Sequence, residues 1–155
     1  MGHYTKIATQ RIPASMDQVW DFMSSPKNLK HITPPYMGFD ITSSNVDEKM
    51  YQGMIITYKV SPLFGLKMDW VTEITTVEHL KMFVDEQRLG PYTMWHHQHH
   101  IEPIEGGVLM RDIVTYIPPM WLFGDIANAL FIKAKLNEIF GFRFDAVEKI
   151  FGKMD

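Results

Sequence analysis

The chain contains no cysteine. This absence excludes disulfide bonds, catalysis by a thiolate and zinc sites built on cysteine ligands. An oxidising compartment is not required, and residues 1–12 show no apolar signal-peptide core. We therefore expect a cytoplasmic protein.

Long apolar runs and an excess of positive charge are missing as well. No stretch reaches the about 18 consecutive apolar residues of a transmembrane helix, so we expect no stable membrane insertion. The 15 Lys and Arg stand against 18 Asp and Glu, which gives a net charge of −3. Because nucleic-acid-binding proteins cluster their basic residues and this chain scatters them, we expect no nucleic-acid partner.

The residues that are abundant point to a folded domain with an irregular interior. The chain has 155 residues, 46% of them hydrophobic, which fits a single domain over residues 1–155. It also has 12 Met, 10 Phe, 6 Tyr and 4 Trp. Such side chains fill irregular cores and adaptable apolar pockets alike, so both interpretations stay open at this point.

The hydrophobic pattern predicts a strand, two short helices and then a sheet. Residues 3–12 alternate as a strand, and Ser15 with Gln18 forms a capping-box pattern before a short helix. A second short helix is expected at 27–32 and a short strand at 39–43. Period-two alternation then predicts five strands joined by short turns, at 54–60, 66–74, 81–88, 92–103 and 108–117.

The C-terminal part predicts one long helix from Asp125 to about Phe151. Its apolar stripe consists of Leu136, Phe140, Val147 and Phe151, with Ala129 and Phe144 beside it. The fold class is therefore α+β, with a curved antiparallel sheet of about seven strands wrapped around this helix. A hollow between the sheet and the helix is the expected site.

Residues 95–100, Trp-His-His-Gln-His-His, carry the strongest chemical signal. Because alternate residues of a strand share a face, His97 and His99 lie on one side with Trp95, which we place inward. His96, Gln98 and His100 then face solvent, and we predict no role for them.

Turn lengths predict which side chains join these histidines. A two- or four-residue turn at Gly106–Gly107 brings Asp112 to their face, whereas a three-residue turn brings Arg111; we favour Asp112. A three-residue loop at 89–91 aligns Asp85 with Trp95, and the preceding turn aligns Thr72 with Asp85. The polar patch expected inside the aromatic concavity consists of Asp85, Gln87, His97, His99 and Asp112.

Three interpretations of this patch stay open. The side chains can hydrogen-bond one another within the core, because a bare buried polar group costs about 1–3 kcal/mol. They can recognise the polar end of an apolar ligand. They can also bind a metal ion, since His-x-His with a carboxylate supplies three ligands. A lone His-x-His is weak evidence, so we predict no metal and no cofactor.

The run Phe83–Tyr92, followed by Trp95, His97 and His99, resembles a bacterial branch of the SRPBCC superfamily, the START-like or Bet v 1-like helix-grip group. Further matching positions are Trp70, Glu73, Ile74, Arg111, Asp112, Tyr116, Pro118, Phe140 and Arg143. Proteins of this branch are described as ligand-binding or polyketide cyclase/dehydrase-like. The resemblance implies a helix-grip fold, with a cavity that binds lipids, hormones or polyketides. The iron-centre relatives carry an extra domain that is absent here.

The first functional hypothesis is a cavity that binds a small, largely hydrophobic molecule with a polar end. The predicted binding residues are Tyr58, Met68, Trp70, Phe83, Asp85, Gln87, Trp95, His97, His99, Val114 and Tyr116. Met54 and Ile101 are expected to complete the lining.

An alternative hypothesis is an enzyme of the cyclase or dehydratase type. His97 or His99 would act as the base, and Asp85 or Asp112 would orient it. Tyr116 or Arg111 would stabilise an enolate oxygen. The sequence leaves open whether any reaction is catalysed.

A third hypothesis is an interaction module. The apolar loop 117–124 would form a homodimer or partner surface, or a lip that touches membranes. The alternative that we favour is that Trp121 and Phe123 close the end of the cavity. Arg143 and Arg111 are expected to pair with Asp112 or Glu73, with recognition of a ligand carboxylate as the alternative.

Overall fold

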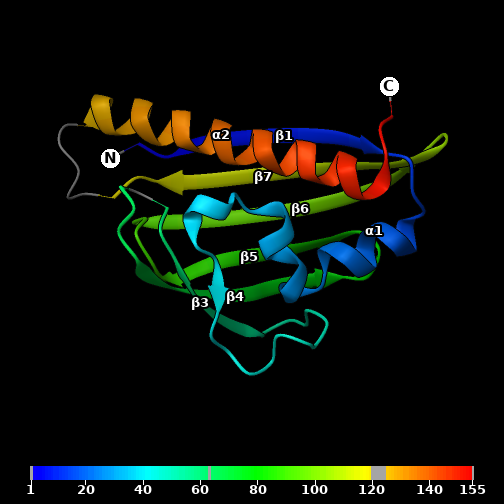
Figure 1. Cartoon of the computed structure of the whole chain (residues 1–155), viewed down its shortest axis with the longest axis horizontal. Coiled ribbons are helices and arrows are strands. Elements are labelled where there is room, and N and C mark those ends of the chain that lie inside the picture. The colour runs from blue at the N-terminus through cyan, green and yellow to red at the C-terminus, as the bar shows by residue number, and fades with distance from the viewer. Residues whose placement is uncertain (1, 63, 120–124, 155) are drawn as a thin grey trace.

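A computed structural model describes residues 2–62, 64–119 and 125–154, the side chains of 125–129 excepted. Within these residues, seven strands form one antiparallel sheet in the order β1-β7-β6-β5-β4-β3-β2. The sheet curves, and the long helix α2 lies along it on the side of β1 and β7 (Figure 1). This architecture confirms the predicted α+β, helix-grip fold.

The elements follow the predicted order. The strands are β1 (Tyr4–Ile12), β2 (Asp40–Ile41), β3 (Ile55–Val60), β4 (Met68–Glu78), β5 (Met82–Leu89), β6 (Met94–Ile104) and β7 (Gly107–Ile117). The helices are α1 (Met16–Met23), the 3-10 helices η1 (Pro26–Ile32) and η2 (Pro35–Met37), and α2 (Asp125–Phe151).

Local sequence signals account for the short elements after β1. The capping box is present, because Ser15 Oγ accepts from the Gln18 backbone N–H at 3.2 Å and Gln18 Oε1 accepts from the Ser15 N–H at 2.9 Å. Pro26 opens η1. The N–H of the first residue of a helix has no acceptor within the helix, so proline, which lacks this N–H, is tolerated there. For the same reason Pro35 opens η2, a helix that the sequence pattern did not predict. Strand β2 is shorter than predicted.

The sheet register confirms one predicted alignment and corrects two. His97 lies opposite Val114 and His99 opposite Asp112, so Asp112 faces inward as favoured. Asp85 lies opposite His97 rather than Trp95. The turn between β5 and β6 is centred one residue later than predicted, which moves the register by two residues and keeps the same face.

The second correction concerns β4 and β5. Asp85 lies opposite Ile74, and Thr72 lies opposite Gln87 instead of Asp85. Two register irregularities interrupt this ladder, between Val71 and Thr72 and between Ile74 and Thr76. Bulges of this kind add residues to one strand, and turn residues alone do not announce them.

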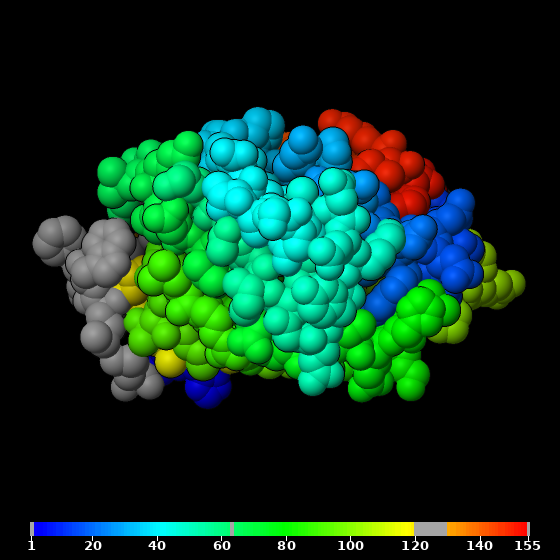
Figure 2. Space-filling view, turned by 90° about the horizontal axis from the view of Figure 1, so that it is seen from below, coloured from blue at the N-terminus to red at the C-terminus, as the bar shows by residue number. Residues whose placement is uncertain are grey.

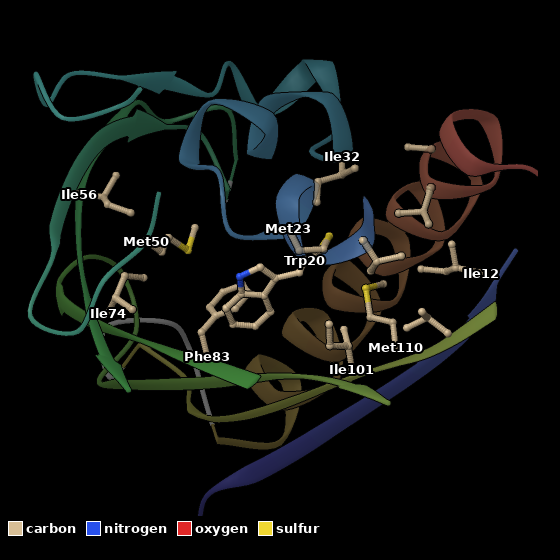
Figure 3. Packing of buried hydrophobic residues seen from close by; sticks show 14 of the residues in the cluster. Ile12, Trp20, Met23, Ile32, Met50, Ile56, Ile74, Phe83, Ile101 and Met110 are labelled. Carbon is tan, nitrogen blue, oxygen red and sulfur yellow. The ribbon is translucent and has the colours of Figure 1, made fainter. Parts of the chain in front are cut away.

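Helix α2 covers the concave side of the sheet with an apolar stripe. Leu136, Phe140 and Val147 are buried, as the spacing predicts, while Phe151 is half-buried. Ile132, which the prediction did not name, is buried as well. The other side of the concavity holds α1 and η1, and in Figure 3 Trp20 of α1 lies next to Phe83 of β5. Seen from below, the chain from η1 to β3 covers the middle of the molecule (Figure 2).

Within the described part of the chain, the buried hydrophobic residues form two clusters. One surrounds Trp20 and includes Phe83, and the other includes Trp70, Leu136 and Phe140. Residues of both clusters border a single cavity. The site described next therefore lies where the two clusters meet.

Candidate functional site

A cavity of about 140 Å³ lies between the concave face of the sheet, the segment from η1 to β3, and helix α2. Ile32, Met50, Ile56, Ile74 and Phe83 surround this interior in Figure 3. Its apolar and aromatic walls come from Leu29, Ile32, Met37, Phe39, Met50, Ile56, Tyr58, Val60, Pro62, Trp70, Ile74, Phe83, Tyr92, Trp95, Leu136, Ile139 and Phe140. The polar lining residues are Thr33, Thr72, Asp85, His97, His99 and Arg143.

The cavity volume limits what can bind in this conformation. Pockets for drug-sized ligands commonly measure about 300–1,000 Å³, which is more than this cavity offers. An apolar cavity of about 150 Å³ engineered in another protein holds benzene. At about 140 Å³, the present cavity admits one ring or a short chain.

Three neighbouring strands place the polar cluster at one wall. His97 and His99 are two residues apart on β6 and therefore share the inner face. The register sets Asp85 of β5 opposite His97 and Asp112 of β7 opposite His99. The two histidine rings lie 3.7 Å apart between the two carboxylates.

His99 is held at both ring nitrogens. Its Nε2 lies 2.7 Å from Asp85 Oδ2, and its Nδ1 lies 2.8 Å from Asp112 Oδ1. The ring also stacks on Phe83, with the centroids 4.2 Å apart. Its position and orientation are thus fixed from three sides.

His97 is held less tightly. Its Nε2 lies 3.1 Å from Asp112 Oδ1, within hydrogen-bond distance. Its Nδ1 lies 3.4 Å from Asp85 Oδ2, the same oxygen that His99 contacts. Both histidines therefore bridge the same pair of carboxylates, through unequal contacts.

Arg143 joins the cluster from helix α2. Its Nη2 lies 3.8 Å from Asp112 Oδ1 and 3.5 Å from His99 Nδ1. Its buried Nε has no hydrogen-bond partner among the residues that the structure describes. The predicted pairing of Arg143 toward Asp112 is therefore seen, while Arg111 lies 3.6 Å from Glu102 and Glu73 binds Arg88.

These contacts shift the pKa values of the buried groups in opposite directions. Burial alone would raise the pKa of Asp112, but Arg143 and the two histidines hold it well below its ordinary value. Burial would lower the pKa of His99, and its hydrogen bonds to Asp112 and Asp85 raise it instead. For His97, burial and the neighbouring His99 prevail, so its pKa is lowered.

The directions define one charge-balanced arrangement. Burial would raise the pKa of Asp85, but His97, His99 and Arg143 lower it. With His99 protonated and His97 neutral, two carboxylates balance one imidazolium and one guanidinium. A buried cluster without net charge avoids the large cost of an uncompensated charge.

The structure brings seven of the predicted binding residues to the cavity. These are Tyr58, Trp70, Phe83, Asp85, Trp95, His97 and His99. Asp112 lies behind the histidines and borders, with Arg143, a smaller hollow beside β1. The assignment of these residues to ligand binding or catalysis stays a prediction.

Four other predicted residues lie away from the cavity lining. Gln87 closes the turn after β5, because its amide donates to the Tyr92 carbonyl at 2.7 Å and accepts from the Tyr92 N–H at 3.1 Å. Val114 packs in the core, and Tyr116 stacks on Tyr4. Met68 is half-buried at the start of β4. Met54 and Ile101 are core residues as well.

The sequence pattern missed lining residues outside the sheet. Leu29 and Thr33 come from η1 and its end, and Ile139 comes from α2. The apolar stripe of α2 was a usable signal for its part of the lining. The 3-10 segment offered no comparable periodicity, since its helical run is only 7 residues long.

A curved antiparallel sheet gripping one long helix around a cavity defines the helix-grip class of folds. No family model matches the chain, and no curated protein matches it in sequence. Among solved structures, TTHA0849 from Thermus thermophilus is similar, with a TM-score of 0.67 at 17% identity over 94% of this chain and 95% of that chain.

Two further solved structures carry more descriptive names. Ara h 8.0201 has a TM-score of 0.61 at 13% identity, over 96% of this chain and 99% of that chain. The di-domain ARO/CYC BexL from the BE-7585A biosynthetic pathway has a TM-score of 0.67 at 16% identity, over 94% of this chain and 50% of that chain. This likeness is one of fold, and the chain has a Bet v 1-like, helix-grip fold.

The remaining predicted surface is the apolar loop 117–124. Residues 120–124 of this loop lie outside the described part of the chain. Across the residues that are described, no helix combines the length and the apolar character that crossing a membrane requires.

Proposed function

We propose that the protein binds a small, largely apolar molecule, about one ring in size, whose polar end contacts the cluster of Asp85, His97, His99 and Arg143. The observation that carries this proposal is the distribution of polarity in the cavity. Apolar and aromatic side chains form most of its lining, and these four polar side chains come together from β5, β6 and α2. A ligand with one polar end satisfies both parts.

A second polar contact supports a defined orientation of the ligand. Tyr58 and Thr72 also line the cavity, and their hydroxyl groups lie 3.0 Å apart. Tyr58 is held between aromatic rings, with Trp70 stacked at 6.0 Å and Phe39 at 4.7 Å. The hydroxyl pair offers a hydrogen-bonding position beside the charged cluster.

The neighbouring structures bear on the ligand class. One similar chain is an ARO/CYC protein of a biosynthetic pathway, and another is Ara h 8.0201. Together with the sequence resemblance, which implies lipids, hormones or polyketides, they make lipids, polyketides and aromatic compounds the classes to consider. The cavity volume of about 140 Å³ favours a single-ring aromatic compound or a short acyl chain over a fused polycyclic molecule.

Native mass spectrometry of the gently purified protein tests this proposal first. An organic mass that is lost on denaturation is the expected result. In parallel, tryptophan fluorescence is followed during titration with single-ring aromatic acids and alcohols, because Trp70 and Trp95 line the cavity. If an added compound were recovered from the protein with a changed mass, this would indicate catalysis in the same cavity.

A matched pair of helix variants locates the binding site. Ile139→Trp places bulk into the cavity wall, whereas Ile150→Trp makes the same change at an exposed position of α2. We expect binding to be lost in the first variant and kept in the second, with both folded by circular dichroism. Equal binding by both variants, or no binding of any compound by the parent protein, would overturn the proposal.

A cytoplasmic location and a homodimer are the remaining proposals about the setting of this function. The cysteine-free composition supports the first. The apolar sequence 117–124 supports the second. Light scattering at several protein concentrations tests the dimer, and a constant monomer mass would remove it.

A further inference from the structure

Three potential metal-ligating atoms meet at the polar wall of the cavity. They are Asp85 Oδ2, His97 Nδ1 and His99 Nε2, from residues whose ligand atoms all lie within 4.8 Å of one another. The carboxylate oxygen lies 2.7 Å from the His99 nitrogen and 3.4 Å from the His97 nitrogen. One oxygen thus faces two ring nitrogens at once.

The opposite nitrogens of both rings are already positioned. His97 Nε2 and His99 Nδ1 lie 3.1 and 2.8 Å from the same atom, Asp112 Oδ1. Metal-ligating histidines almost always donate their second ring N–H to a carboxylate, a carbonyl or water, which fixes the tautomer and the ring orientation. In the metal-free protein both ring nitrogens of His99 face carboxylate oxygens. Metal binding would release the Nε2 proton to solvent, so that each ring keeps a donor N–H toward Asp112 and offers the lone pair of its cavity-side nitrogen to the ion.

The cavity lies on the side of the three candidate ligands. Asp85, His97 and His99 all line it, whereas Asp112 borders the smaller hollow on the other side. A site with three protein ligands keeps a coordination position open for water or a bound molecule, as catalytic zinc sites do. That open position would face the cavity interior.

We propose that Asp85, His97 and His99 bind one divalent transition-metal ion, of the zinc class, with Asp112 as the positioning residue for both imidazoles. Two histidines and one carboxylate form a ligand set that suits zinc and related ions. The proposal deepens the proposed function, because the metal would contact the polar end of the molecule in the cavity.

Ligand spacing sets the movement that binding requires. Zinc bonds to nitrogen and oxygen measure about 2.0–2.2 Å, so tetrahedral ligand atoms lie roughly 3.3 Å apart. The His97 to Asp85 contact of 3.4 Å already has this spacing. The His99 to Asp85 contact of 2.7 Å has to open by several tenths of an ångström, and the two ring nitrogens, which lie within 4.8 Å of each other, have to settle at the same spacing.

The charge of the site defines the molecule that completes it. With neutral imidazoles as ligands, the carboxylates of Asp85 and Asp112 offset a divalent ion. Arg143 then leaves one positive charge near the site, since its Nη2 lies 3.8 Å from Asp112. An anionic oxygen, from a carboxylate or an enolate, balances that charge at the open coordination position.

Metal titration without any organic ligand tests the proposal. The full chain is stripped with a chelator, dialysed and titrated with ZnCl₂ by calorimetry, and with CoCl₂ by visible absorption, which reports the coordination number. We expect one equivalent to bind and the absorption bands of a four- or five-coordinate Co²⁺ ion to appear. No stoichiometric binding, or a spectrum of six-coordinate hydrated Co²⁺, would overturn the proposal.

Strand β6 itself supplies the matched controls. His97→Gln and His99→Gln should abolish stoichiometric binding, whereas His96→Gln and His100→Gln, on the opposite face, should retain it. Asp112→Asn should weaken binding by about 10–100-fold and leave the stoichiometry unchanged. Circular dichroism identifies any variant that fails to fold, and the Co²⁺ spectrum of the parent protein decides the question in that case.

The two proposals fail separately in these experiments. Binding of an aromatic compound by the chelated protein, with no uptake of Zn²⁺ or Co²⁺, would overturn the metal site and leave the ligand cavity standing. Stoichiometric metal binding that His96→Gln removes and His97→Gln retains would also overturn it, since the ion would then lie on the outer face. Metal binding with no aromatic ligand would support the metal site and count against the proposed function.

Discussion

Strand β6 carries two pairs of histidines, one on each face. The inner pair, His97 and His99, is buried between carboxylates from β5 and β7. The outer pair, His96 and His100, is half-buried and joined through Gln98, with contacts of 3.3 and 2.9 Å. His96 also meets Glu86 at 2.6 Å.

The comparison shows that a histidine pair on a strand does not by itself define the site. Both pairs have carboxylate or amide partners, but the inner pair is buried and borders the apolar cavity, whereas the outer pair is partly exposed. Removing a charge partner in a buried cluster leaves an uncompensated charge, whereas water replaces a lost partner at the surface. Substitutions on the inner face should therefore lower the free energy of unfolding more than substitutions on the outer face, when both are measured in the metal-free protein.

The largest effect is expected at Asp112, which contacts both inner histidines and Arg143. Asp112→Ala should lower the free energy of unfolding by about 3–5 kcal/mol, because it strands several buried partners. Glu86→Ala on the outer face should cost only about 0.2–1 kcal/mol. Urea denaturation measures both, and equal losses would show that burial does not separate the two faces.

The next effect concerns His99 and its outer counterpart. His99→Gln removes two short carboxylate contacts and a stacked ring, and should cost about 2–4 kcal/mol. His100→Gln should stay within about 0.5 kcal/mol, as other surface substitutions do. If His100→Gln lowered the free energy of unfolding as much as His99→Gln, the histidines of the inner face would not contribute more to stability than those of the outer face.

The stability loss at His97 should lie between the losses at His99 and His100. Its single close contact, 3.1 Å to Asp112, and its 3.4 Å approach to Asp85 are both longer than those of His99. His97→Gln should therefore cost about 1–3 kcal/mol, less than His99→Gln in the same urea series. His96→Gln serves as the surface control in this series. A larger loss in the free energy of unfolding for His97→Gln than for His99→Gln would contradict the ranking by contact distance.

Much of the fold was predictable because its signals are local. The capping box at Ser15, period-two alternation through β3 to β7 and the stripe of α2 each involve residues close in sequence. The inward face of Asp112 followed from turn parity, since Glu105 and Gly106 form a two-residue connection between β6 and β7.

The exact partners in the site were not predictable in the same way. The pairing of Asp85 with His97 depends on where the turn after β5 is centred, and the Gln87 amide stabilises that turn through Tyr92. The bulges in β4 depend on packing across the sheet, as does the exclusion of Met68 from the cavity. Arg143 reaches the cluster from α2, a contact over 44 residues of sequence from His99.

The smallest expected effect is the coupling energy of the outer pair, His96 and Glu86. A double-mutant cycle with His96→Gln and Glu86→Gln should give about 0.2–1 kcal/mol, because both side chains are partly exposed to water. The equivalent cycle with His99→Gln and Asp85→Asn should give a larger value.

Raising the salt concentration to 1 M shortens the Debye length to about 3 Å. The outer coupling should fall under this change while the inner coupling persists, since solvent ions do not reach a buried pair. An inner coupling that falls in parallel would mean that the cluster is open to solvent, and the contrast between the two faces of β6 would be lost.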